Sequence, residues 1–209
     1  MSSSITLKEV QSFLDSSSKT LNNPVAVFAG GTSGIGENTA YEFAKVSINP
    51  KIYIVGRNQE AADRDINRIN EINSNAKCEF VKSDLILLKN SNKAADYILQ
   101  KEPKINLVYV SCGYLHASGY TASDEGIDTK LSLHYLSRFQ IIDKLLPSLD
   151  KAGNKGELAR VVSVLAAGYE TPLDFSNLDL KKYSSIKINS AYTPTLNSLS
   201  MEYLASKHP

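Results

Sequence analysis

The sequence predicts a doubly wound α/β domain built on a parallel sheet of about five strands. Three observations predict this fold. Short, continuous apolar runs recur along the chain, as in parallel strands that are buried on both faces. Longer stretches with helical spacing of apolar residues separate these runs, and such alternation joins parallel strands through right-handed crossovers. A glycine-rich turn, residues 30–36, follows the first run.

The first strand is predicted at residues 25–29, where every residue is apolar. The other strands are predicted at 51–55, 78–81, 105–110 and 160–164. Helices are predicted at 34–46, 58–73, 88–101 and 123–149, with a last helix over part of 184–206. Ile66, Ile69 and Ile72 give the second helix its apolar face. Pro147 marks the expected end of the fourth, because proline disfavours a helix interior.

Residues 5–15 show a further helical pattern ahead of this alternation. Serines at 16–18 and the segment 22–24, Asn-Asn-Pro, interrupt that pattern. We therefore expect residues 1–23 to form an N-terminal helix and linker. Residues 24–209 are expected to form one domain.

The composition excludes several classes of partner. Lys and Arg number 23 and Asp and Glu 22, so no global field favours nucleic acid or an anionic membrane. The two cysteines, Cys78 and Cys112, have no metal-ligand spacing, so no metal site is predicted, and reduced thiols indicate a cytoplasmic protein. The N-terminus has no signal-peptide pattern, and no apolar stretch is long enough to span a bilayer.

The turn after the first strand is the strongest functional signal. Its glycines allow a tight turn, a close approach of backbone to a pyrophosphate, and close packing of helix on strand. The following helix presents free N–H groups to an anion, and two hydroxyl side chains add donors. The turn thus predicts an NAD(P)-binding Rossmann domain, with cofactor contacts from Gly30, Thr32, Ser33, Gly34, Ile35 and Gly36.

The glycine spacing, Gly-x-x-x-Gly-x-Gly, resembles that of the short-chain dehydrogenase/reductase family. Ala29 stands where that family usually has threonine. The phrases Gly-Gly-Thr-Ser-Gly-Ile-Gly and Leu-His-Tyr-Leu-Ser-Arg are similar to a divergent, mainly fungal-type branch. The resemblance implies an oxidoreductase that interconverts a small aldehyde or ketone and an alcohol by hydride transfer.

The second strand ends in a segment that favours NADP over NAD. Gly56 occupies the place of the carboxylate that would bind the ribose hydroxyls, and Arg57 and Asn58 follow it. A guanidinium binds a 2′-phosphate that a carboxylate would repel. The resemblance further implies adenine contacts from Asp84 and Leu85, and a ribose contact at Gly113.

The family uses a tyrosine as proton donor and a lysine four residues later, and Tyr183 and Lys187 form such a pair after the predicted fifth strand. On a helix the two side chains would share a face. An alternative register, counted back from the C-terminus, places Ser190 and Pro194 at these positions. Tyr192 is a second candidate donor, without a lysine four residues later.

The family's serine and asparagine are replaced here. The register of the fifth strand puts Ala166 at the serine position, and Ser163 is the nearest hydroxyl. His134 stands where the family has asparagine, and a histidine can donate, accept and shuttle protons. The resemblance thus implies Tyr183, Lys187, Ser163 and His134 as catalytic residues.

The resemblance also implies two more strands and a substrate-binding segment beyond residue 209, so we expect a chain truncated at its C-terminus. The fifth strand would then be an exposed edge, unless a partner such as a second copy of the chain covers it. These departures leave an alternative to the enzyme, namely a non-catalytic dinucleotide-binding or interaction protein with the same fold.

Overall fold

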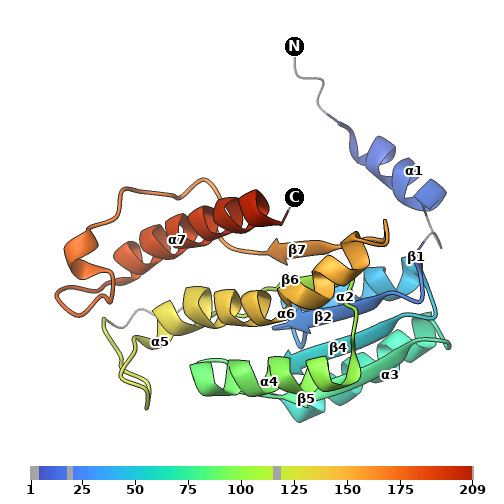
Figure 1. Ribbon diagram of the computed structural model, residues 1–209, viewed down its shortest axis with the longest axis horizontal. Helices are drawn as coiled ribbons and strands as arrows, with labels where there is room; N and C mark the ends of the chain where they lie inside the picture. The colour runs from blue at the N-terminus through green and yellow to red at the C-terminus, as the bar shows by residue number, and fades with distance from the viewer. Residues whose placement is uncertain (1–4, 18–20, 115–118, 209) are drawn as a thin grey trace.

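The computed structural model describes residues 5–17, 21–114 and 119–208. Its centre is a parallel sheet of five strands in the order β5-β4-β2-β6-β7 (Figure 1). The strands are β2 (Val25–Ala29), β4 (Lys51–Gly56), β5 (Lys77–Lys82), β6 (Leu107–Val110) and β7 (Arg160–Ser163). The predicted doubly wound α/β fold is thereby confirmed, and each predicted strand lies within two residues of its observed bounds.

The strand β2 lies at the middle of the sheet, and all five of its residues are buried. Its side chains alternate between two cores. Val25, Val27 and Ala29 pack with residues of α4 (Leu88–Lys101), α6 (Ser137–Gly153) and the end of α7 (Ile186–Lys207). Ala26 and Phe28 pack with residues of α2 (Gly34–Val46) and α3 (Gln59–Ile72). Helices thus cover both faces, which explains why the strand sequence is apolar throughout.

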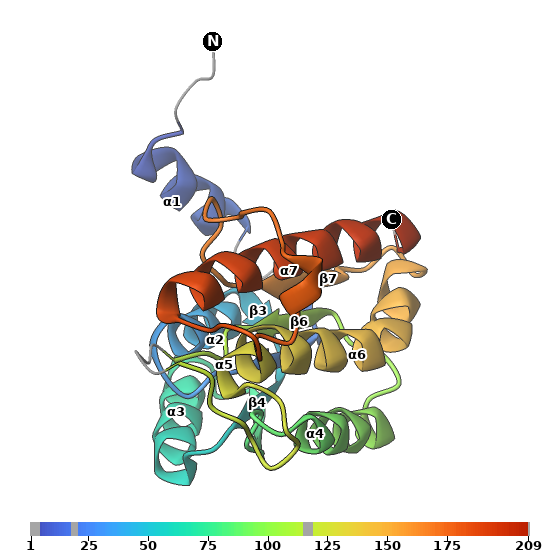
Figure 2. The ribbon, with the colours of Figure 1, turned by 90° about the vertical axis from the view of Figure 1, so that its left-hand side faces the viewer.

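The helices on the two faces keep most of their predicted bounds. They are α2 (Gly34–Val46), α3 (Gln59–Ile72), α4 (Leu88–Lys101), α6 (Ser137–Gly153) and α7 (Ile186–Lys207). A short α1 (Leu7–Ser17) projects away from the sheet in both views (Figures 1 and 2). The division of the chain into a linker and one domain stays a prediction.

The predicted helix at 123–149 is wrong at both ends. It begins at α5 (Thr129–Leu131), where the Asp128 side chain accepts hydrogen bonds from two amides of the first turn, and it passes through a π-helical turn (Ser132–Leu136) into α6. Pro147 lies inside α6, which continues to Gly153. A proline removes one intrahelical hydrogen bond, and the buried face of α6 outweighs that loss. Pro194 is likewise accommodated within α7, where it is buried.

The sequence did not predict a second, two-stranded parallel pair, β1 (Leu21–Asn22) with β3 (Ser47–Ile48). Segments of two residues are too short to show a periodic pattern. At the other side of the domain, β7 pairs with β6 and forms an edge of the sheet, and its side chains are only partly buried. None of the described helices is long and apolar enough to cross a membrane.

Candidate functional site

The glycine turn connects β2 to α2 at the carboxyl end of the central strand. The Gly30 amide donates to the Val55 carbonyl over 2.9 Å, which ties the turn to β4. Gly30 has φ of +86°, and a Cβ there would lie 2.5 Å from the Cys112 amide nitrogen. A Cβ at Gly36 would lie 2.4 Å from the Gly30 carbonyl oxygen. Both positions therefore require glycine, and the backbone of the turn lies directly against the end of β6.

The N-terminus of α2 points its amides out of the turn. Ser33 precedes the helix in an extended conformation, and its side chain does not cap the first turn. The Gly34 amide donates to the Glu37 carboxylate over 3.1 Å, while helix geometry leaves Ile35 and Gly36 without intrahelical acceptors. A Cβ at Gly34 would meet nothing within 4 Å, so this helix end faces open space. The position suits an anion such as a pyrophosphate.

A cavity of about 330 Å³ lies along this turn and the neighbouring strand ends. Most of the predicted cofactor residues line it, namely Gly30, Thr32, Ser33, Ile35, Gly36, Arg57, Asp84, Leu85 and Gly113. Gly34 and Asn58 are not among the lining residues. Asn58 instead caps α3, where its side chain accepts from the Ala61 amide over 3.1 Å, and its role as a cofactor contact stays a prediction.

One end of the cavity lies over β4 and β5. The Arg57 guanidinium lies 4.0 Å from the Asp84 carboxylate, and its side chain is 64% exposed. A second cavity of about 530 Å³ adjoins this end and shares Arg57, Ser83 and Asp84 with the first. At this end Arg57 is exposed enough to reach a phosphate, and Asp84 is its ion-pair partner.

The other end of the cavity lies over β6 and β7. There, buried side chains hold the backbone of the lining residues in place. The Arg138 guanidinium of α6 donates to the Cys112 carbonyl from two nitrogens and to the Val164 carbonyl over 2.6 Å. Both acceptors line the cavity. Sequence reasoning missed Arg138. The spacing could have shown that this arginine is buried. It lies three, four and seven residues before Ile141, Ile142 and Leu145, on the same buried face of the helix.

His134 binds the backbone of Tyr114, another residue that lines this end of the cavity. Its Nε2 accepts from the Tyr114 amide over 3.1 Å, and the Tyr114 hydroxyl donates to Thr129 over 2.7 Å. Burial, and next the Arg138 guanidinium, lower the pKa of His134 to about 4. At neutral pH the imidazole is therefore uncharged and acts as an acceptor, which argues against a shuttle of protons through it.

The predicted tyrosine and lysine do not share a helix face. Tyr183 precedes α7, whose cap is Ser185, and Lys187 is the second residue of the helix. The Tyr183 hydroxyl donates to the Asp174 carboxylate, and this hydrogen bond raises the pKa of the tyrosine. The prediction of a common face is wrong, because the side chain of Ser185 caps the helix at the Ile188 amide and starts it after the tyrosine.

The other predicted catalytic residue, Ser163, is also turned away from the cavity. Its hydroxyl donates to the Asn197 side chain of α7 over 2.7 Å and lies 3.5 Å from Arg138. Val164 follows it and does line the cavity, while Ala166 is exposed. Among the described residues, none of the four predicted catalytic side chains lines the 330 Å³ cavity.

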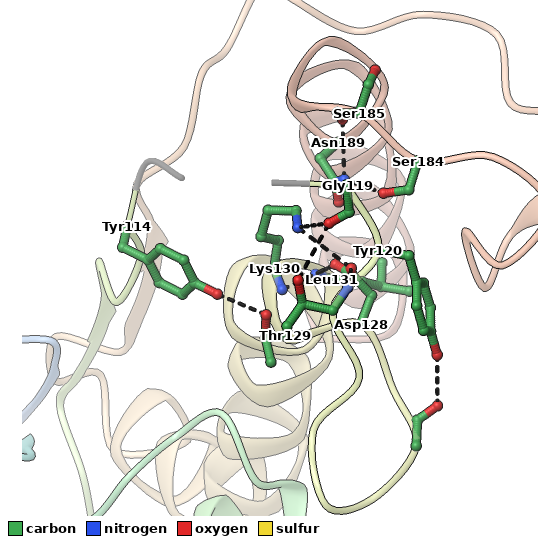
Figure 3. A network of polar contacts seen from close by, with 12 residues as sticks. Tyr114, Gly119, Tyr120, Asp128, Thr129, Lys130, Leu131, Ser184, Ser185 and Asn189 are labelled. Carbon is green, nitrogen blue, oxygen red and sulfur yellow. Dashed lines mark hydrogen bonds and ion pairs between the residues drawn. The ribbon is translucent and has the colours of Figure 1, made fainter. Parts of the chain in front are cut away.

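A buried ion pair, formed by Lys130 and Asp128, lies near Tyr114 (Figure 3). Lys130 is 2% exposed and Asp128 is fully buried. The Lys130 Nζ donates to the Gly119 carbonyl over 2.7 Å and lies 3.5 Å from the Asp128 carboxylate. Figure 3 shows this ammonium directed at Gly119, with Asn189 of α7 close by. The pair therefore anchors the segment after residue 118 to the start of α5.

Comparison with known proteins agrees with this geometry. The family model "short chain dehydrogenase" matches residues 24–173. "Oxidoreductase AN1596" of Emericella nidulans is 34% identical over 205 residues, which cover 98% of this chain and 60% of the relative. "Oxidoreductase andH" of Emericella variicolor is 38% identical over 182 residues, which cover 87% of this chain and 53% of that protein.

Solved structures show the same fold. The Pseudomonas aeruginosa RhlG/NADP active-site complex superposes with a TM-score of 0.66 at 18% identity, over 91% of this chain and 69% of that one. The chain spans only 53 to 60% of the length of the two Emericella relatives.

Proposed function

This chain belongs to the short-chain dehydrogenase family, and we propose that it is an oxidoreductase that uses NADP(H) to interconvert a carbonyl compound and an alcohol. The observation that carries the proposal is one cavity that joins the glycine turn, the N-terminus of α2 and Arg57. Relatives named oxidoreductase support it. The substrate would be a small molecule.

The residues of the cavity fit a dinucleotide in one orientation. The pyrophosphate would lie on the turn at Gly34, where free amides and the helix dipole favour an anion. The adenosine half would then extend towards Arg57 over β4, and the nicotinamide half towards Cys112 and Val164 over β6 and β7. When bound, the nicotinamide would supply or accept the hydride, and the protein would orient it and move a proton.

The preference for NADP rests on Arg57. Calorimetric titration with NADPH and NADH should give tighter binding of NADPH, and Arg57→Ala should weaken NADPH binding by about tenfold, as expected for an exposed charge-assisted contact. NADH binding should not change. Arg68→Ala, at an exposed arginine on α3, is the matched control. Equal weakening of both cofactors by Arg57→Ala would refute the assignment of the phosphate.

Two tyrosines are candidates for the proton donor. Tyr183 was predicted, and Tyr114 lines the cavity. Oxidation of NADPH should be measured across a panel of aldehydes and ketones for Tyr183→Phe, Tyr114→Phe and the control Tyr203→Phe, at an exposed position of α7. Loss of a proton donor should lower turnover by roughly a hundredfold or more. A variant that keeps full turnover eliminates its tyrosine from this role.

A second candidate function is non-catalytic binding of the dinucleotide. The observation in its favour is that Tyr183, Lys187, Ser163 and His134 are absent from the cavity lining of the described chain. It predicts that NADPH binds and that no carbonyl compound of the panel is reduced. Measurable turnover with any member of the panel excludes it.

We also propose a cytoplasmic location and self-association as working expectations. The location rests on two free cysteines, Cys78 and Cys112. Self-association would use the edge of β7, where Val162 is 39% exposed.

A further inference from the structure

Arg138 is a buried charge that no carboxylate neutralises among the described residues. The residue is 2% exposed. Its hydrogen-bond partners are the Cys112 and Val164 carbonyls and, at 3.5 Å, the Ser163 hydroxyl, all of them uncharged. Burial lowers the pKa of the guanidinium, yet an arginine stays protonated in proteins. A full positive charge therefore remains buried next to the carboxyl ends of β6 and β7.

The neighbouring titratable groups do not cancel this charge. Burial raises the pKa of the Cys112 thiol, so the thiol is neutral. His134 is neutral above pH 5, because its pKa is about 4. Lys130 is paired with Asp128, which leaves that pair with no net charge. The field at this end of the cavity is consequently positive.

The charge lies under one end of the cavity only. Cys112 and Val164 line that end, and a Cβ at Gly113, a third lining residue, would lie 3.3 Å from the Arg138 Nη2. The sheet order separates this end, over β6 and β7, from Arg57 at the end of β4. A dinucleotide whose phosphate is held at Arg57 would therefore place its redox-active ring near Arg138.

We infer that Arg138 makes the cavity select the reduced dinucleotide over the oxidised one. The inference rests on the proposed cofactor. The two forms differ by one hydride, so the oxidised nicotinamide ring carries a positive charge that the reduced ring lacks. Repulsion by Arg138 acts on the oxidised ring alone, whereas attraction of the phosphates is common to both forms. The protein would then take up the reduced cofactor and readily release the oxidised one.

Coulomb's law gives the size of the effect. Two unit charges about 10 Å apart, at an effective dielectric constant of about 20 to 40, change a binding constant by roughly 4- to 20-fold. The ratio of the dissociation constants of the oxidised and reduced forms should therefore fall by roughly this factor when the charge is removed.

The test compares this ratio among variants of the 209-residue chain. Calorimetry gives the dissociation constants of NADP⁺ and NADPH for the wild type, Arg138→Gln and Arg138→Lys. Arg138→Gln should lower the ratio, and Arg138→Lys should retain it, because lysine keeps the charge. Arg160→Gln, at the exposed start of β7, is the matched control and should leave both constants unchanged.

A purely structural role for Arg138 would weaken both forms equally, so an unchanged ratio in Arg138→Gln overturns the inference. If that variant does not fold, the wild type still decides, because tighter binding of NADP⁺ than of NADPH overturns the inference as well. Absence of binding of either form to the wild type is a different result, since it refutes the proposed function itself.

Discussion

Replacing His134 by glutamine should make the stability of the protein less sensitive to mild acid. In the structure the His134 Nε2 accepts a hydrogen bond from the Tyr114 amide over 3.1 Å. A protonated imidazole cannot accept at that nitrogen. The glutamine amide oxygen can accept the same bond but does not titrate. The substitution therefore removes the ionisation and keeps a bond of the same kind.

The direction and size of the effect follow from the pKa of the histidine. Burial, and next Arg138, lower it from 6.5 to about 4 in the folded protein. Above pH 6.5 both folded and unfolded chains hold a neutral imidazole. As the pH falls from 6.5 to 4, only the unfolded chain binds a proton, so the folded state loses stability, by about 2 kcal/mol at pH 5.

Urea unfolding at pH 7.5 and pH 5.0 measures this effect. The wild type should lose about 2 kcal/mol more than His134→Gln between the two values. Other groups that titrate in this range contribute equally to both proteins and cancel in the difference. His208→Gln, at a partly exposed histidine 3.0 Å from Asp150, controls for the loss of an imidazole. Parallel pH profiles for the wild type and His134→Gln would refute the reasoning.

Two further substitutions test the turn and the buried ion pair. Gly36→Ala places a methyl group 2.4 Å from the carbonyl of the first glycine of the turn, so binding of NADPH by calorimetry should weaken at least about tenfold. Gly153→Ala, whose Cβ meets an ordinary 3.5 Å contact, should bind normally. Asp128→Asn leaves buried Lys130 unpaired, so a urea titration should show a free energy of unfolding lower by about 3 kcal/mol. In the same titration Asp179→Asn, at an exposed pair, should change the free energy of unfolding by less than about 1 kcal/mol.

The strands and the glycine turn were predictable because their determinants are local. A strand buried on both faces needs a continuous apolar sequence, and β2 has one. Gly30 and Gly36 fit the turn because no Cβ has room there, and their spacing reveals it. Arg57 follows the strand directly, so its place at the cavity depends on no distant contact.

The other end of the cavity depends on tertiary contacts that spacing does not reveal. Tyr183 and Lys187 have the spacing of helical neighbours, but Ser185 caps α7 between them. Asn58 has the position of a cofactor contact, but its side chain is used as the cap of α3. Capping residues and binding residues are drawn from the same polar types, so sequence alone does not separate the two uses.

The two ends of the cavity therefore differ in how a substitution acts on them. At the end over β4 and β5, where the proposal puts the adenosine half, Arg57 is exposed, and its removal should change affinity without leaving a buried group unpaired. At the opposite end, removal of Arg138 deprives the Cys112 and Val164 carbonyls of their donors as well as removing a charge. Loss of stability or of activity in an Arg138 variant would consequently have two causes at once. Only a pair of ligands that differ in charge and share every other contact separates the two, and the oxidised and reduced dinucleotides approach such a pair.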